Sequence, residues 1–262
     1  MSKSNKDIST CAYCNRFGKF TREHIFPICL IKKVPNYTAK YSLKAKKVFG
    51  AELIVKDVCA ICNNDFLGKL DEYICKLYDE YFSLFVDAND KVVFKYDYNK
   101  LLRWLLKISY NSGRTTNQDI DLLSKYKNYI LYGGDYPEDV AIFIDLIPPA
   151  FDDSNTKIYP KSMRCGKIKT TYFNYDWLTI RVVAINSFYF YLAFFPIFED
   201  SIPKDEFNLF GNKFPGILLN FNKNLDTLFV SKQTDSYEIH KDHLTENQAI
   251  YDHYFNIKKS QI

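Results

Sequence analysis

The spacing of apolar positions along the chain changes from helical in the first half to strand-like in the second. In residues 64–85 apolar side chains recur every three or four positions, and residues 99–111 follow the same period. A short strand is expected between them, at residues 91–97. Ser112-Gly113 is predicted to end the second helix, and residues 119–131 are predicted to form a third one.

From residue 139 onward the apolar runs are rich in β-branched and aromatic residues, which favour strands. These runs are residues 140–146, 172–175, 177–185, 188–195 and 216–221. Asn186-Ser187 separates two of them and is predicted to form a hairpin turn. The pattern indicates an α+β fold, with a mixed helical and antiparallel-sheet domain in the second part of the chain.

Composition is that of a soluble globular protein, since 47% of the 262 residues are apolar and 25% are charged. Disordered and fibrous classes are excluded. The most apolar window, residues 177–198, is interrupted by Arg181, so a membrane span is not expected. The polar first ten residues lack the apolar stretch of a secretory signal, and a cytoplasmic location is predicted.

Positive charge is concentrated at the start of the chain. Residues 1–70 contain 13 Lys and Arg against 5 Asp and Glu, whereas the remaining residues carry a net charge of −4. A basic segment of this kind favours a polyanion as partner, because each phosphate contact releases counterions. DNA is the expected partner, with RNA as the alternative.

Four of the seven cysteines form two Cys-x-x-Cys pairs, Cys11/Cys14 and Cys59/Cys62, with 44 residues between them. Two such pairs match the four-thiolate ligand set of structural zinc, and the alternative interpretation is two buried cysteine pairs or one redox pair. Cys29, Cys75 and Cys165 are expected to be small buried hydrophobic residues.

Further motifs lie beside these pairs. Thr-Arg-Glu-His-Ile-Phe-Pro occupies residues 21–27, and Asn63-Asn64 directly follows Cys62. The order C-x-x-C, E-H-I-x-P, C-x-x-C-N over residues 9–75 resembles the zinc-stapled HNH endonucleases, which have a ββα-metal fold. The resemblance implies a DNA-cleaving module whose fold is held by Zn²⁺ and whose reaction uses Mg²⁺ or Mn²⁺. It also suggests a restriction or anti-phage role.

The residue types suit phosphodiester hydrolysis. An imidazole titrates near neutrality, so His24 can act as the general base that activates water. Glu23 and Asn63 offer hard oxygen atoms, which Mg²⁺ and Mn²⁺ prefer. By resemblance, His24 takes the position of the base, and Glu23 and Asn63 those of the catalytic metal ligands. Asn64 is the alternative to Asn63, and a solvated surface pair is the alternative for Glu23-His24.

Two departures from the family pattern stand out. The first metal ligand is commonly Asp, and Glu23 is one methylene longer. Family members also carry a middle Asn that orients the loop of the base, and this chain has Ile54 there. The support for His24 must therefore come from another residue.

Basic side chains near these motifs are candidates for contacts with nucleic acid, and aromatic residues among them can stack on bases. A solvated loop whose lysines keep it soluble is the alternative for the segment from residue 32 to residue 47. The candidates are Arg22, Lys32, Lys33, Lys40, Lys44, Lys46 and Lys47.

The chain is predicted to divide into a nuclease module, residues 1–86, and a specificity, sensing or assembly domain, residues 87–262. The second domain is the expected location of contacts with a second copy, in a homodimer, or with a partner chain. The predicted function is a metal-dependent HNH endonuclease. The alternative is a zinc-stabilised protein that binds nucleic acid or a partner without turnover.

Overall fold

The structure is a computed structural model of the chain. It describes residues 10–33, 39–42, 47–50, 53–151, 154–160, 163–168, 177–195, 216–219 and 226–230. Helices and strands are mixed along these residues, and all paired strands in them run antiparallel. The predicted α+β class is therefore confirmed.

A two-stranded sheet and a helix form the first part. Strand β1 (Phe20–His24) pairs with β4 (Ile54–Cys59). The chain then enters a continuous helical segment, which has α-helical geometry in α2 (Gly68–Leu77) and π-helical geometry in η1 (Cys62–Leu67) and η2 (Tyr78–Phe82). The helix predicted at residues 64–85 is thus confirmed.

Three short elements connect β1 to β4. Helix α1 (Ile28–Lys33) begins just after Pro27, whose carbonyl oxygen accepts hydrogen bonds from the first turn. Strands β2 (Ala39–Ser42) and β3 (Lys47–Gly50) form a hairpin. These elements therefore lie between the two paired strands β1 and β4 in the sequence.

The central helix, α3 (Tyr98–Thr116), is longer than predicted. Its first turn is capped by Asp97, whose carboxylate accepts from the backbone N–H of Lys100 at 3.1 Å. The predicted stop at Gly113 is wrong. A Cβ atom at this position would lie 2.6 Å from the carbonyl oxygen of Gln118, so the glycine permits the following chain to pack against the helix.

The helix predicted at residues 119–131 is divided into α4 (Ile120–Ser124) and α5 (Lys127–Tyr132). Gly133 follows α5 directly with a φ of +71°, a conformation that favours glycine. The predicted end of this helical region is therefore correct, although its interior is interrupted.

The main sheet has the strand order β12 (Ile217–Leu218), β6 (Val140–Leu146), β11 (Phe188–Phe194), β10 (Thr179–Ile185) and β9 (Met163–Ile168). Asn186 occupies the predicted turn between β10 and β11 with a φ of +50°. Of the other predicted strands, residues 172–175 lie outside the described part of the chain. Of residues 216–221 the structure describes 216–219, which contain a short strand. The remaining strands are β5 (Lys91–Lys95), β7 (Ala150–Phe151), β8 (Lys157–Ile158) and β13 (Asp226–Val230).

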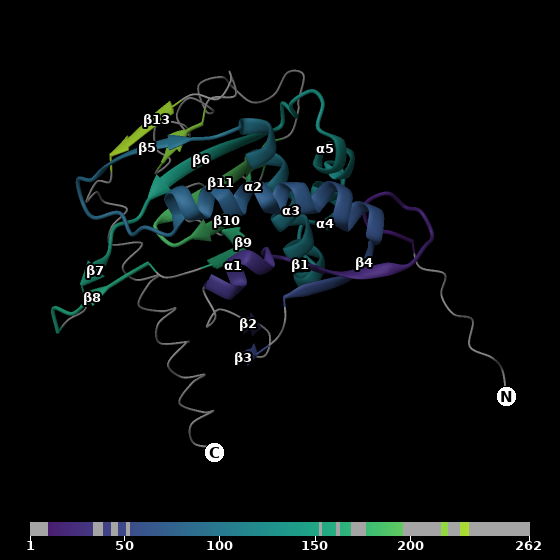
Figure 1. The fold of residues 1–262 in the computed structure, drawn as a ribbon, viewed down its shortest axis with the longest axis horizontal. Helices are drawn as coiled ribbons and strands as arrows, with labels where there is room; N and C mark the ends of the chain where they lie inside the picture. Colours follow the sequence, from purple (N-terminus) through teal and green to yellow (C-terminus); the bar gives the residue numbers. More distant parts are fainter. Residues whose placement is uncertain are drawn as a thin grey trace, which may run out of the picture.

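Helix α3 lies between the two-stranded β1–β4 sheet and the main sheet (Figure 1), and it contacts β4, α2, β9 and β10. One cluster of buried apolar side chains runs from Cys11 to Leu219. Side chains on both sides of the domain boundary predicted at residue 86 share this cluster, and the boundary itself stays a prediction. None of the helices in the described ranges is long and apolar enough to cross a membrane.

Candidate functional site

The two cysteine pairs meet where β1 begins and β4 ends. The sulfur atoms of Cys11, Cys14, Cys59 and Cys62 all lie within 4.8 Å of one another. Tetrahedral zinc with Zn–S bonds of about 2.3 Å requires sulfur atoms roughly 3.8 Å apart. The Sγ atoms of Cys14 and Cys59 are 3.8 Å apart. Four cysteines close together can thus hold a metal ion such as zinc.

Hydrogen bonds within the cluster also suit thiolate ligands. The backbone N–H of Cys59 donates to Sγ of Cys11 at 3.3 Å. Burial raises the pKa of Cys11, but backbone N–H groups more than offset it, and the pKa falls to about 7. Burial and the neighbouring thiols raise the pKa of Cys62. The four groups cannot all ionise without a cation to compensate their charge, which is what a bound metal would supply.

A cavity of about 600 Å³ lies beside the end of β1 and the start of the helical segment. The four residues predicted for the reaction line it: Glu23, His24, Asn63 and Asn64. The rest of the lining comes mainly from α1 and α2, and consists of Arg22, Pro27, Ile28, Cys29, Gly68, Asp71, Glu72, Cys75, Lys76 and Asp79. The fold therefore brings together residues that are 40 positions apart in the sequence.

Consecutive side chains on β1 differ in their surroundings, as strand geometry requires. Glu23 is buried, with 3% of its surface exposed, and His24 is partly exposed. The side-chain amide of Asn63 donates to Thr21 Oγ1 at 2.8 Å and to the carbonyl oxygen of Arg22 at 3.1 Å. These bonds attach the start of the helical segment to β1 and hold the amide at the cavity.

Lys107 of α3 lies directly against this site. Its side chain is completely buried, and its ammonium group is 2.5 Å from Oε1 of Glu23 and 2.8 and 3.0 Å from the two carboxylate oxygens of Asp71. It also donates to the carbonyl oxygen of His24 at 3.4 Å. Lys107 thus contacts the backbone of His24, the candidate base. It can provide the support that the middle Asn, absent from this chain, provides in the resembled family.

The pKa values in this cluster reflect burial and mutual attraction. Burial raises the pKa of Glu23 and of Asp71, although the Lys107 ammonium opposes the shift. Burial lowers the pKa of Lys107, but the two carboxylates more than offset it, so the pKa lies above 10.5. The ammonium therefore stays charged at neutral pH.

Other polar residues on the same face of α3 extend the network. The indole of Trp104 donates to Asp71 at 3.1 Å, and Asn111 donates to Glu23 at 3.5 Å. Arg114 forms an ion pair with Asp57 of β4 at 2.6 Å. These positions follow one another at intervals of three or four residues, so they share one face of the helix.

The sequence interpretation missed Lys107. A signal was present, because Lys107 interrupts an apolar run at helical spacing from Trp104 and Asn111. Polar residues on a buried helix face need partners. The partners themselves could not be identified, since they lie 36 and 84 positions away in the sequence.

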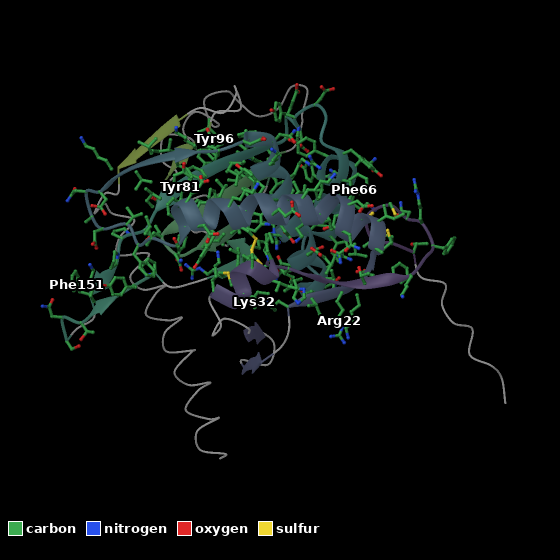
Figure 2. All side chains as sticks on the ribbon, viewed as in Figure 1. Arg22, Lys32, Phe66, Tyr81, Tyr96 and Phe151 are labelled. Carbon is green, nitrogen blue, oxygen red and sulfur yellow. A yellow bond between two sulfur atoms is a disulfide. The ribbon has the colours of Figure 1, made fainter. Side chains whose placement is uncertain are left out.

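The candidate nucleic-acid contacts are only partly described. Arg22 lines the cavity and is exposed, and Figure 2 shows it pointing away from the body of the molecule. Lys32 is exposed, and Lys33 forms an ion pair with Asp79 of the helical segment. Lys40 lies on β2 and Lys47 on β3. Lys44 and Lys46 lie outside the described residues.

The isolated cysteines differ from expectation. Cys29 and Cys75, predicted to be buried hydrophobic residues, form a disulfide between α1 and α2, with Cα atoms 6.2 Å apart. Helix packing brings them together across 46 positions of sequence, which no local pattern indicates. Both line the cavity. Cys165 remains a free thiol and is partly buried.

No family model, no curated protein and no solved structure matches this chain. The HNH resemblance of the short motifs stays a prediction.

Proposed function

We propose that the protein is a metal-dependent endonuclease that hydrolyses phosphodiester bonds in DNA, in the manner of HNH enzymes. The observation that carries the proposal is the placement of Glu23, His24 and Asn63 on one cavity beside the four-cysteine cluster. Strand β1 carries Glu23 and His24, and the helical segment that follows β4 carries Asn63, an order expected for the ββα-metal fold of the resembled family.

Each residue has a distinct task in this reaction. His24 takes a proton from the attacking water, and its carbonyl oxygen is held by Lys107. The side-chain oxygen of Asn63 is available as a hard ligand, because the amide nitrogen makes the bonds to β1. Glu23, anchored through Oε1 by Lys107, is the second hard ligand.

The carboxylates of the cavity favour a role for a divalent cation. Four of them line it, and Lys107 and Lys33 pair with three of the four. Carboxylate oxygens are ligands that Mg²⁺ and Mn²⁺ prefer. A bound Mg²⁺ or Mn²⁺ would stabilise the charge that develops on the leaving oxygen.

One observation favours a binding protein without turnover as the second candidate. Glu23 is almost completely buried and already paired with a lysine, whereas a metal ligand in a working site is commonly reached by water and substrate. In that case the zinc cluster would support a nucleic-acid-binding surface, and Glu23 would serve only the ion-pair network.

The test is the cleavage of supercoiled, linear, branched and single-stranded DNA with Mg²⁺ and with Mn²⁺. His24→Ala should lower the cleavage rate by about 10²–10⁴-fold, the usual contribution of a general base, while zinc content and DNA affinity stay unchanged. Cleavage by His24→Ala at the wild-type rate would refute the catalytic role. Absence of cleavage by the zinc-loaded wild type on all substrates would favour the binding protein.

Asn63 and Asn64 offer a matched pair for the metal site. Asn63→Ala should raise the Mn²⁺ concentration needed for half-maximal activity, because it removes a ligand oxygen. Asn64 is exposed at the next position, so Asn64→Ala serves as the control. The reverse result would assign the ligand to Asn64.

A further inference from the structure

A single aromatic side chain is presented to solvent beside the four-cysteine cluster. Phe17 is 67% exposed, more than any other large hydrophobic side chain in the described part of the chain. It lies between Cys14 and β1, where neighbouring residues from Asn15 to Lys19 are exposed as well. Exposing a phenyl ring is unfavourable in water. Together with the basic side chains around it, the exposed ring is a candidate contact for a partner.

Backbone hydrogen bonds hold the turn that carries Phe17 in place. The N–H of Cys11 donates to the carbonyl oxygen of Arg16 at 2.9 Å, and the N–H of Asn15 donates to that of Cys11 at 2.9 Å. Phe17 also forms an isolated β-bridge with Thr10. The turn therefore presents the ring on a fixed support, which lowers the entropy lost when a partner binds.

The charges around Phe17 indicate the chemistry of that partner. Arg16, Lys19 and Arg22 are exposed, and the segment from residue 11 to residue 22 contains no Asp or Glu. Basic side chains on both sides of an exposed aromatic ring match a nucleic-acid strand, whose phosphates pair with the cations and whose bases stack on the ring. A partner with a neutral surface would gain nothing from these basic side chains.

The turn is also within reach of a DNA segment that enters the cavity. His24 lies seven positions after Phe17, which at about 3.4 Å per extended residue is at most roughly 24 Å. Figure 1 shows the turn and α1 at opposite ends of β1. With a rise of about 3.4 Å per nucleotide, about seven nucleotides of one strand cover this distance.

We propose that Phe17 is a base-stacking residue that makes the protein select DNA with unpaired bases, such as gaps, bulges and branch points. In a continuous duplex every base is stacked on its neighbours and paired. Unpaired bases have free faces and can stack on the ring, while Arg16 and Lys19 contact the adjoining phosphates. The inference rests on the proposed function, since it names the form of its DNA substrate.

The experiment measures binding of the zinc-loaded full chain, without added Mg²⁺ or Mn²⁺, to three fluorescein-labelled oligonucleotides. These are a continuous duplex, the same duplex with a three-nucleotide gap, and the single strand. Phe17→Ala should weaken binding to the gapped duplex and the single strand by about five- to 160-fold, the range expected for one lost stack, and change duplex binding less than about twofold. Phe17→Trp should restore the preference.

Two sets of variants serve as controls. Leu84 is 63% exposed and lies at the other end of the helical segment from the cysteine cluster. Leu84→Ala removes an equally exposed apolar side chain and should leave all three affinities unchanged. The double variant Arg16→Ala/Lys19→Ala should weaken all three complexes and lower the dependence of affinity on salt.

The proposal would be overturned if Phe17→Ala weakened duplex and gapped DNA equally, changed neither, or was not restored by Trp. Because no cleavage is needed, this outcome is separate from the failure of the proposed function. A wild type that cleaves no DNA would refute the nuclease, and the binding ratios would still decide the role of Phe17.

Discussion

Lys107→Met tests whether the fold depends on the ion-pair cluster beneath the cavity. The substitution keeps most of the length of the side chain and removes its charge, which leaves Glu23 and Asp71 facing each other without a cation. Removing one partner of a buried ion pair typically costs about 3–5 kcal/mol. For a chain of this size, each kcal/mol corresponds to about 2–4 °C in melting temperature, so a decrease of roughly 6–20 °C is expected.

The loss of stability should depend on pH. Burial already raises the pKa of Glu23 and Asp71 above the usual 4.5 and 3.8, and removal of the ammonium raises both further. A carboxyl group with a raised pKa in the folded state destabilises the fold as pH rises above its unfolded value. The two carboxylates raise the pKa of Lys107, so its ammonium group stays charged in the wild type at both pH 5.5 and pH 8. The stability deficit of Lys107→Met should therefore be larger at pH 8 than at pH 5.5.

The assay is urea unfolding of wild type and Lys107→Met at both pH values, with zinc content measured in each sample. A deficit under 1 kcal/mol at pH 8, or an equal deficit at both pH values, would refute the reasoning. Adding Glu23→Gln to the variant should recover part of the loss, because it removes one of the two unpaired charges.

Arg181→Met is the matched control for activity. Arg181 is also completely enclosed by protein, and it pairs with Asp119 at 2.8 Å and with Ser112 at 2.7 Å, outside the cavity. Its replacement should lower stability in a similar way. Only Lys107→Met should lower the cleavage rate per folded molecule, since only Lys107 holds Glu23 and the backbone of His24.

Three further predictions concern zinc, backbone packing and the disulfide. Elemental analysis should find one zinc per chain, and Cys59→Ser should lose the zinc and unfold the surrounding hairpin; less than about half a zinc in unchelated protein would contradict the four-thiolate site. Gly113→Ala should lower the melting temperature because its Cβ would meet a backbone carbonyl oxygen at 2.6 Å, whereas Gly18→Ala, with nothing within 4 Å, should not; equal effects would argue against this packing. Cys29→Ser should lower stability by about 4 kcal/mol, the loop entropy of a link across 46 positions, with Cys165→Ser as the control; a thiol titration that counts Cys29 and Cys75 as free would contradict the disulfide.

Features whose cause lies within a few residues could be predicted from the sequence. The Cys-x-x-Cys spacing indicated a four-cysteine cluster because two ligands of one metal can come from a single turn. The β10–β11 hairpin followed from two apolar runs and the Asn186-Ser187 turn between them. The alternation of side chains along a strand placed Glu23 and His24 in different surroundings. The motifs around them indicated Glu23, His24, Asn63 and its alternative Asn64, which all line the cavity.

Contacts between distant segments were decided only by the tertiary structure. No local pattern shows that Lys107 reaches Glu23 and Asp71, or that Cys29 meets Cys75. The continuation of α3 beyond Gly113 likewise depends on the chain that packs against it. A sequence pattern reports the preferences of neighbouring residues, whereas the partners of a buried charge or thiol depend on how whole helices and strands pack together.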